Sequence, residues 1–195
     1  PNSDFEAAKA RQLQVLDRMV DQKYITQEQA DNTTKYLRYS SDYADAKDAD
    51  LCIEAVPEVK EIKAGVYENL DKVVRPDTII SSTTSAANIF AWAKKVSHPE
   101  RLIITHFNNP SHIVPLVEIV VGPKTSEENV KDIRALIEKI GRKPAVLNKY
   151  VPGFIVNRLT AALLREASYM VDKGWVSMED VDTAFSCNQA LKAPF

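Results

Sequence analysis

Apolar residues at helical spacing open the chain. Between residues 3 and 22 they recur at roughly every third or fourth position, from Phe5 to Val20, which predicts an amphipathic helix. The stretch Thr26-Gln-Glu-Gln29 has the spacing of a capping box and predicts a second helix that runs to about Tyr36. The N-terminal part of the chain is therefore expected to be helical.

Short apolar runs then alternate with amphipathic segments as far as residue 148. The predicted strands cover residues 51–56, 78–82, 101–106, 115–121 and 143–148. The predicted helices between them cover residues 58–74, 86–96 and 126–141, and Gly141 suits a left-handed position at a helix end. This alternation predicts an α/β fold with a mainly parallel sheet and flanking helices.

The pattern becomes entirely helical after residue 152. Residues 153–173 are apolar on several sides, so we expect this helix to pack against a partner or further helices. Ser177-Met-Glu-Asp180 is another capping sequence and predicts one more helix. We therefore predict two domains, an α/β domain over residues 1–150 and the start of an all-α domain over residues 151–195.

Composition narrows the range of partners. The net charge of −2 argues against a nucleic acid or an anionic membrane as the main partner, and no apolar run is long enough to span a membrane. Cys52 and Cys187 form neither a zinc pattern nor a disulfide framework. Cys52 lies in an apolar run and is expected to be a buried free thiol, which favours a reducing, cytoplasmic setting.

Polar residues gather where predicted strands and helices meet, the place where open α/β sheets bind ligands. The hydroxyl-rich stretch Ser81-Ser-Thr-Thr-Ser85 suits either helix capping or ligand binding. Asn157, near the start of the apolar helix, suits either a substrate contact or a hydrogen bond within the fold. The charged stretch Glu58–Lys63 is interpreted, on its pattern alone, as a solvated helix start.

His106 and Glu118 form the most informative pair. His106 ends a predicted strand and has the chemistry of a general base. Glu118 lies inside the apolar run Pro115–Val121, where a carboxylate needs a hydrogen-bonding or cationic partner. Its partner is either His106, which the carboxylate would orient as a base, or an arginine in a structural pair, Arg101 or Arg158.

Five segments together resemble the 3-hydroxyacyl-CoA dehydrogenase family, and their order and spacing fit that family over nearly the whole chain. The resemblance implies a Rossmann-like NAD-binding domain followed by a helical domain for the substrate and the dimer contact. The matching segments are Leu51-Cys-Ile-Glu-Ala-Val-Pro-Glu58, Ser81-Ser-Thr-Thr-Ser85, His106-Phe-Asn-Asn-Pro110, Pro115-Leu-Val-Glu-Ile119 and Pro152-Gly-Phe-Ile-Val-Asn-Arg158.

The resemblance also implies residue roles in catalysis. His106 matches the base that takes the proton of the substrate's 3-hydroxyl, and Glu118 matches the carboxylate that orients this histidine. Ser85 matches a serine that contacts both the substrate oxygen and the cofactor, and Asn157 matches an asparagine that helps to hold the substrate. The implied reaction transfers a hydride from C3 of an L-3-hydroxyacyl thioester to NAD⁺.

Three further residues match cofactor contacts of the family. Glu58 and Lys63 match residues near the nicotinamide ribose, and Asn109 matches an asparagine beside the histidine. The family's Gly-x-Gly-x-x-Gly turn, which binds the pyrophosphate, does not occur among the five glycines of this sequence. We therefore expect the 195 residues to be part of a longer chain and, as they stand, to bind NAD weakly or not at all.

The resemblance leaves the substrate open between two branches of the family. An acyl-CoA substrate is the first interpretation, and a carnitine- or gulonate-type 3-hydroxy acid is the alternative, with His112 able to face a polar substrate. A non-catalytic, structural or oligomeric member of the fold is a third interpretation, which the joint presence of Ser85, His106, Glu118 and Asn157 disfavours. In each case a homodimer or higher homo-oligomer is expected.

Overall fold

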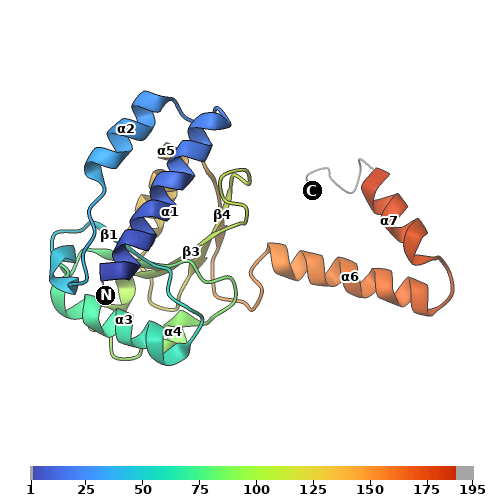
Figure 1. Ribbon diagram of the computed structural model, residues 1–195. Coiled ribbons are helices and arrows are strands. Elements are labelled where there is room, and N and C mark those ends of the chain that lie inside the picture. Colours follow the sequence, from blue (N-terminus) through green and yellow to red (C-terminus); the bar gives the residue numbers. More distant parts are fainter. Residues whose placement is uncertain (1, 188–195) are drawn as a thin grey trace. The chain divides into compact units, whose positions relative to one another are not determined.

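A computed structural model describes residues 2–187 of the chain (Figure 1). Residues 188–195, the end of the predicted all-α domain, lie outside the described residues. The chain forms two compact units, residues 1–45 and 46–195. The first contains α1 (Asn2–Asp21) and α2 (Gln27–Tyr36), so both N-terminal helices are confirmed.

The predicted capping box begins α2. The Thr26 hydroxyl accepts a hydrogen bond from the Gln29 backbone N–H at 3.1 Å, and the Gln29 side chain accepts one from the Thr26 N–H at 2.8 Å. Two N–H groups at the helix start are thereby satisfied. A short 3-10 helix, η1 (Tyr43–Ala46), then leads into the second unit.

The second unit is built on a five-stranded sheet in the order β1-β2-β3-β4-β5. All neighbouring strands are parallel except β3 and β4, which are antiparallel. The connection between β3 and β4 is short and contains no helix, whereas a parallel crossover needs a dozen or more residues. The strands are β1 (Leu51–Glu54), β2 (Ile79–Ser82), β3 (Leu102–Phe107), β4 (Leu116–Val121) and β5 (Lys143–Leu147).

Helices cover the two faces of this sheet (Figure 1). On one face α3 (Lys60–Val73) and α4 (Ile89–Trp92) pack against alternate strand residues such as Ile80 and Ile104. On the other face α5 (Glu127–Lys139) packs Ile133 and Ile137 against Ile103 and Ile119. The predicted α/β fold with a mainly parallel, Rossmann-like sheet is confirmed.

Two features of this unit differ from the sequence predictions. The predicted helix over residues 86–96 is wrong beyond one turn, because only Ile89–Trp92 are helical. Ile89, Ala93 and Val96 are all buried in the core, which explains why their spacing suggested a longer helix. Cys52 is only partly buried rather than buried, although burial is the largest influence on its thiol and raises its pKa.

The remaining helical predictions are confirmed. Gly141, after α5, has a φ of 76° and takes the left-handed conformation that glycine favours. The Ser177 hydroxyl accepts a hydrogen bond from the Asp180 N–H at 3.1 Å and caps α7 (Met178–Cys187). The apolar C-terminal helix is α6 (Val156–Asp172), and none of its residues is buried. Its expected packing partner stays a prediction.

Candidate active site

The sheet places His106 and Glu118 directly opposite one another. The two residues are register partners in the antiparallel pair β3–β4, so their side chains lie on the same face at short range. His106 Nδ1 and Glu118 Oε2 are 2.7 Å apart, and the imidazole side chain is 12% exposed while the carboxylate side chain is 1% exposed. The predicted pair is therefore formed, and its histidine is the member that solvent reaches.

Glu118 also holds the beginning of α6. Its other oxygen, Oε1, accepts hydrogen bonds from the backbone N–H groups of Ile155 at 2.8 Å and Val156 at 3.0 Å. These N–H groups have no partner within the helix, and the positive end of the helix dipole favours a carboxylate there. Both carboxylate oxygens are thus satisfied in a buried position.

The alternative arginine partners of Glu118 are engaged elsewhere. Arg101 pairs with Asp71 at 2.6 Å, and Arg158 donates to the Pro152 carbonyl at 3.4 Å. With the carboxylate on Nδ1, a neutral imidazole keeps its proton at that nitrogen and presents Nε2 as a bare acceptor. This arrangement can accept a proton from a substrate hydroxyl.

Phe154 completes the surroundings of the histidine. Its side chain is 1% exposed, and its ring meets the His106 ring edge-on with centroids 5.6 Å apart. Its φ of 48° lies in the left-handed region that non-glycine residues rarely adopt. The turn Gly153–Phe154 therefore directs the following N–H groups onto Glu118, at some cost in backbone energy.

In the hydroxyl-rich stretch Ser81–Ser85, some hydroxyls form hydrogen bonds within the fold and one is exposed. The Ser81 hydroxyl bonds the Thr105 hydroxyl at 2.7 Å, and the Ser82 hydroxyl donates to Glu54 at 2.7 Å. The Thr84 hydroxyl accepts from backbone N–H groups of the following turn. Ser85 is exposed in the loop after β2, at the carboxyl edge of the parallel strands, and is therefore available to a ligand.

The other predicted site residues lie around the same edge without joining the pair. Asn157 is exposed and follows directly on Val156, whose N–H is bound by Glu118. Asn109 is exposed in the loop after β3. Within the described part of the chain, no hydrogen bond connects Ser85, Asn109 or Asn157 to His106 or Glu118. The structure thus joins the His106–Glu118 pair, called the dyad below, to the start of α6. It leaves these three side chains exposed and unbonded to the dyad.

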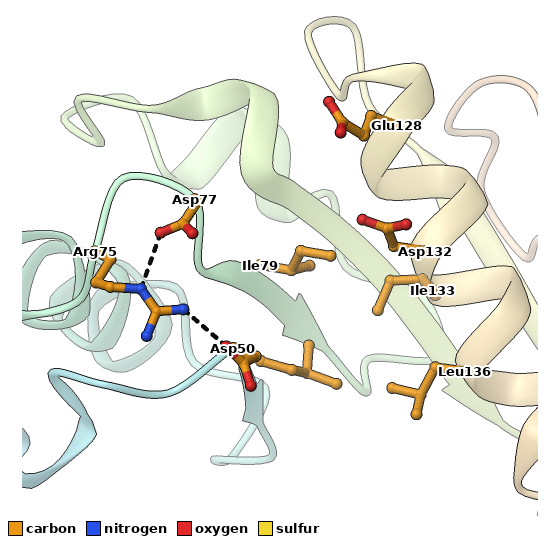
Figure 2. A pocket seen from close by; sticks show the side chains of 9 residues that line it. Asp50, Arg75, Asp77, Ile79, Glu128, Asp132, Ile133 and Leu136 are labelled. Carbon is orange, nitrogen blue, oxygen red and sulfur yellow. Dashed lines mark hydrogen bonds and ion pairs between the residues drawn. The ribbon is translucent and has the colours of Figure 1, made fainter.

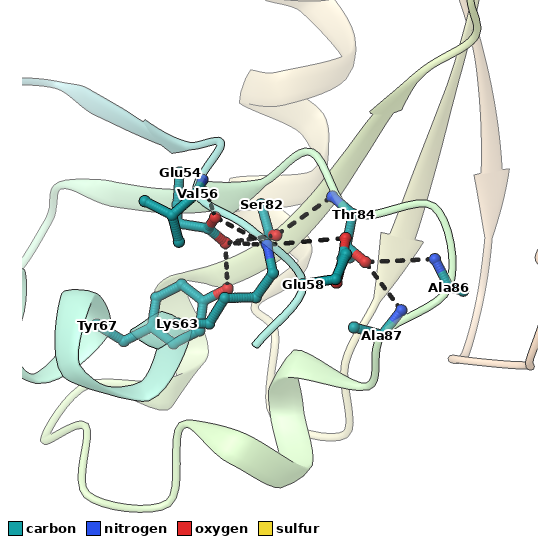
Figure 3. A network of polar contacts seen from close by, with 9 residues as sticks. All are labelled: Glu54, Val56, Glu58, Lys63, Tyr67, Ser82, Thr84, Ala86 and Ala87. Atoms are coloured by element: carbon teal, nitrogen blue, oxygen red, sulfur yellow. Dashed lines mark hydrogen bonds and ion pairs between the residues drawn. The ribbon is translucent and has the colours of Figure 1, made fainter. Parts of the chain in front are cut away.

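A second buried carboxylate, Glu54, was not identified from the sequence. It ends β1 and is 3% exposed. It accepts hydrogen bonds from Lys63 Nζ at 2.8 and 3.0 Å, Tyr67 Oη at 2.6 Å, Ser82 Oγ at 2.7 Å and the Val56 N–H at 2.7 Å (Figure 3). Burial by itself raises the pKa of this carboxyl, but the hydrogen bonds hold it below its usual range.

This network corrects the interpretation of Glu58–Lys63 as a solvated helix start. Lys63 is 1% exposed and is neutralised by Glu54, because a buried ammonium needs a paired charge. Glu58 remains half-exposed, with its carboxylate 3.8 Å from Lys63 Nζ. Burial, followed by the contact with Glu54, raises the pKa of Tyr67, so this phenol stays a hydrogen-bond donor. The network joins α3 to the carboxyl ends of β1 and β2.

These residues fit one half of an NAD molecule. Glu58 is an exposed acceptor beside a buried lysine, and Ser85 is an exposed hydroxyl at the same sheet edge, which is the edge where open α/β sheets bind dinucleotides. Glu58 and Ser85 present exposed oxygen atoms that can bond ribose or nicotinamide groups, whereas Lys63 is buried with its ammonium on Glu54. A glycine-rich pyrophosphate turn is not in the sequence, and the expected weak NAD binding of these 195 residues stays a prediction.

A pocket lies away from the His106–Glu118 dyad (Figure 2). It has a volume of about 410 Å³ and an apolar floor that includes Leu51, Ile79 and Ile133. Leu51 and Ile79 begin their strands, so this pocket sits at the amino edge of the sheet, opposite to the end of β3. Arg75 on its rim is already paired with Asp50 at 2.7 Å and Asp77 at 3.1 Å. It therefore belongs to no predicted site.

Among residues 2–187, no helix combines the length and the apolar character that crossing a membrane requires. The same range contains no group of three or more His, Cys, Asp or Glu side chains that could hold a metal ion.

Comparisons with known proteins give consistent relatives. The chain is 45% identical over 151 residues to 5-formyl-3-hydroxy-2-methylpyridine 4-carboxylate 5-dehydrogenase of Mesorhizobium japonicum, covering 77% of this chain and 49% of the relative. It is 40% identical over 146 residues to L-carnitine dehydrogenase of Oceanobacillus iheyensis, covering 75% and 48%. The chain thus spans about half the length of these curated relatives.

A solved structure extends the likeness to nearly the whole chain. The 3-hydroxybutyryl-CoA dehydrogenase of Escherichia coli superposes with a TM-score of 0.86 at 31% identity, covering 95% of this chain and 39% of that one. The family model of the 3-hydroxyacyl-CoA dehydrogenase NAD-binding domain matches residues 2–150, and that of the C-terminal domain matches residues 153–194. The chain belongs to the 3-hydroxyacyl-CoA dehydrogenase family of NAD-dependent oxidoreductases.

Proposed function

We propose that the whole protein oxidises a secondary alcohol to a ketone with NAD⁺ and that His106 is the general base. The observation that carries this proposal is the 2.7 Å contact between His106 Nδ1 and the buried Glu118 carboxylate. Nε2 then accepts the hydroxyl proton as the C–H bond gives up its hydride. Glu118 stabilises the resulting imidazolium, which is the role of the carboxylate in a catalytic triad.

The open side chains around the dyad position the reactants. Ser85 donates a hydrogen bond to the substrate oxygen, and Asn157 holds the substrate from the start of α6. Glu58 and Asn109 contact the nicotinamide end of the cofactor, and Lys63 lies buried behind Glu58 with its ammonium on Glu54. When bound, NAD⁺ supplies the hydride acceptor.

Two substrate classes are supported by different observations. An L-3-hydroxyacyl-CoA is supported by the family match and by the likeness to the 3-hydroxybutyryl-CoA dehydrogenase. A small polar hydroxy acid is supported by the relatives at 45% and 40% identity, which are named for a pyridine carboxylate and for L-carnitine. We therefore propose a 3-hydroxyacyl-CoA or a small 3-hydroxy acid as the substrate.

Oligomerisation completes the proposal. The α6 surface exposes Leu159 by 50%, Leu163 by 49% and Leu164 by 63%, and clustered exposed apolar residues favour an interface. We propose that this helix packs against other helices in a homodimer or higher homo-oligomer. Size-exclusion chromatography with light scattering on the whole protein tests this part, and a monomer at micromolar concentration would contradict it.

The test of function uses the whole protein with NAD⁺ and three substrates: L-3-hydroxybutyryl-CoA, L-carnitine and L-gulonate. Reduction of NAD⁺ is followed for the wild type, His106→Ala and His98→Ala. His98 is the matched control, because its side chain is 42% exposed and bonds only Glu100 among the described residues. We expect turnover with at least one substrate, unchanged by His98→Ala and lost in His106→Ala. Full turnover by a folded His106→Ala variant would refute the proposal.

A further inference from the structure

Asn108, two residues after His106, has a side-chain nitrogen that finds no hydrogen-bond partner in the described part of the chain. The side-chain nitrogen Nδ2 of Asn108 is buried and has no hydrogen-bond partner among residues 2–187. Within residues 2–187, one other buried side-chain nitrogen has no hydrogen-bond partner, Nε of Arg101. The other two guanidinium nitrogens of Arg101 each donate a hydrogen bond. Buried amide donors are normally paired, so an orphan at this place requires an explanation.

Strand geometry puts Asn108 on the same face as the dyad. Its backbone N–H donates to the Leu116 carbonyl at 3.4 Å, which continues the β3–β4 ladder one step beyond Phe107. Side chains alternate between the two faces of a strand, so Asn108 shares the face of His106, and Leu116 shares the face of Glu118. Two residues along a strand span about 6.6 Å, which is within the reach of one small substrate.

We infer that Asn108 is a specificity-determining residue that donates a hydrogen bond to the carboxylate of a small hydroxy acid. This inference rests on the proposed function and deepens it, because it selects the polar-acid class of substrate. Among residues 2–187 the fold leaves this amide donor unpaired, near a base that needs its substrate hydroxyl held in place. A carboxylate is the stronger acceptor for such a donor than a neutral thioester oxygen.

The size of a useful substrate follows from the same geometry. Nε2 of His106 receives the hydroxyl proton at one end, and Asn108 binds the carboxylate at the other. The two groups are separated by two residues of one strand, so the hydroxyl and the carboxylate lie within a few bonds of each other. Relatives named for a hydroxypyridine carboxylate and for L-carnitine act on molecules of that scale.

The experiment combines turnover and stability. In the whole protein, kcat/KM is measured for the acid that the wild type oxidises, L-carnitine or L-gulonate, and for the neutral amide of that acid. The variants are Asn108→Ala, which removes the donor, and Asn108→Asp, which replaces it with a negative acceptor. Asn129→Ala is the matched control, because the Asn129 Nδ2 already donates to the Glu100 carbonyl at 2.9 Å.

A lost hydrogen bond to a charged acceptor corresponds to a fall in kcat/KM of about 10- to 100-fold. We expect this fall in Asn108→Ala with the acid but not with its amide, and a larger fall in Asn108→Asp. In the whole protein, Asn108→Ala should keep the melting midpoint within about 2 °C of the wild type, because Nδ2 makes no hydrogen bond within residues 2–187. Asn129→Ala should lower the midpoint and leave kcat/KM unchanged.

The outcomes separate the inference from the proposed function. A wild-type protein that oxidises only the acyl-CoA substrate overturns the inference and leaves the proposed function standing. An unchanged kcat/KM in Asn108→Ala also overturns the inference. So does a melting midpoint lowered as in Asn129→Ala, which would give the Asn108 amide a structural role. A wild-type protein that oxidises none of the three substrates defeats the proposed function itself.

Discussion

Glu118→Gln separates the structural role of this residue from its role in catalysis. The glutamine side chain has the same shape, and its oxygen can still accept from the backbone N–H groups of Ile155 and Val156, which share one carboxylate oxygen in the wild type. Its NH₂ group then faces His106 Nδ1. Two donors cannot bond each other, so the neutral imidazole must move its proton to Nε2, the atom that should accept the substrate proton.

The two effects differ in magnitude. A charge-assisted hydrogen bond at 2.7 Å is replaced by a neutral one, which lowers the free energy of unfolding by about 1–2 kcal/mol. The wrong tautomer lowers kcat by about 10³- to 10⁴-fold, as an Asp-to-Asn change does in a catalytic triad. The larger figure corresponds to roughly 5.5 kcal/mol of barrier. Turnover should therefore collapse in a protein that remains folded.

The assay pairs urea denaturation of the 195-residue chain with steady-state kinetics of the whole protein. Glu138→Gln is the control, because it makes the same change on a side chain that is 53% exposed and bonded to Arg134; an exposed pair contributes about 1 kcal/mol or less. The reasoning is refuted if Glu118→Gln keeps more than a tenth of wild-type kcat. Unfolding of the variant at room temperature would refute the stability half.

Three further predictions concern the rest of the fold. Tyr67→Phe removes one donor from the buried Glu54 carboxylate and should lower the unfolding free energy by about 1.5–3 kcal/mol; a loss below about 0.5 kcal/mol in urea denaturation would contradict this. Because the folded-state pKa of Glu54 is depressed, its stabilisation is present above the unfolded-state pKa of about 4.3 and is lost as the pH falls further. Acid titrations should therefore show a smaller loss of stability in Glu54→Gln than in the wild type, and equal slopes would argue against the network. Gly122→Ala places a Cβ that clashes with the Phe90 ring, whereas the Cβ of Gly65→Ala meets nothing within 4 Å. Calorimetry should show that the free energy of unfolding falls by about 1–3 kcal/mol in Gly122→Ala and rises by about 0.5–1 kcal/mol in Gly65→Ala. Equal changes in the two variants would contradict the packing described for Gly122.

The sequence pattern predicted most of the sheet because its strands are apolar runs separated by clear turns. The antiparallel pair β3–β4 brought His106 opposite Glu118, and the prediction that a carboxylate in an apolar strand needs a partner was correct. The helix predicted over 86–96 was too long because Ile89, Ala93 and Val96 reach the core without a continuous helix.

Other parts of the site depend on tertiary contacts. Glu54 lies in an apolar run as Glu118 does, and Lys63 and Tyr67 lie four residues apart on one face of α3. The same reasoning could have found this network, but it requires the helix to be placed over β1. The left-handed φ of Phe154 and the unpaired amide of Asn108 have no sequence signature, because each is defined by what the fold brings, or fails to bring, next to the residue.

The position of the proton on His106 tests the central claim most directly. Nitrogen-15 NMR of the labelled 195-residue chain in alkaline buffer reports which imidazole nitrogen carries the proton. With Glu118 bound at Nδ1, the spectrum should show a protonated Nδ1 and a bare Nε2, ready to accept a proton. A proton fixed on Nε2, or the mixture of tautomers typical of a free imidazole, would contradict the proposed base.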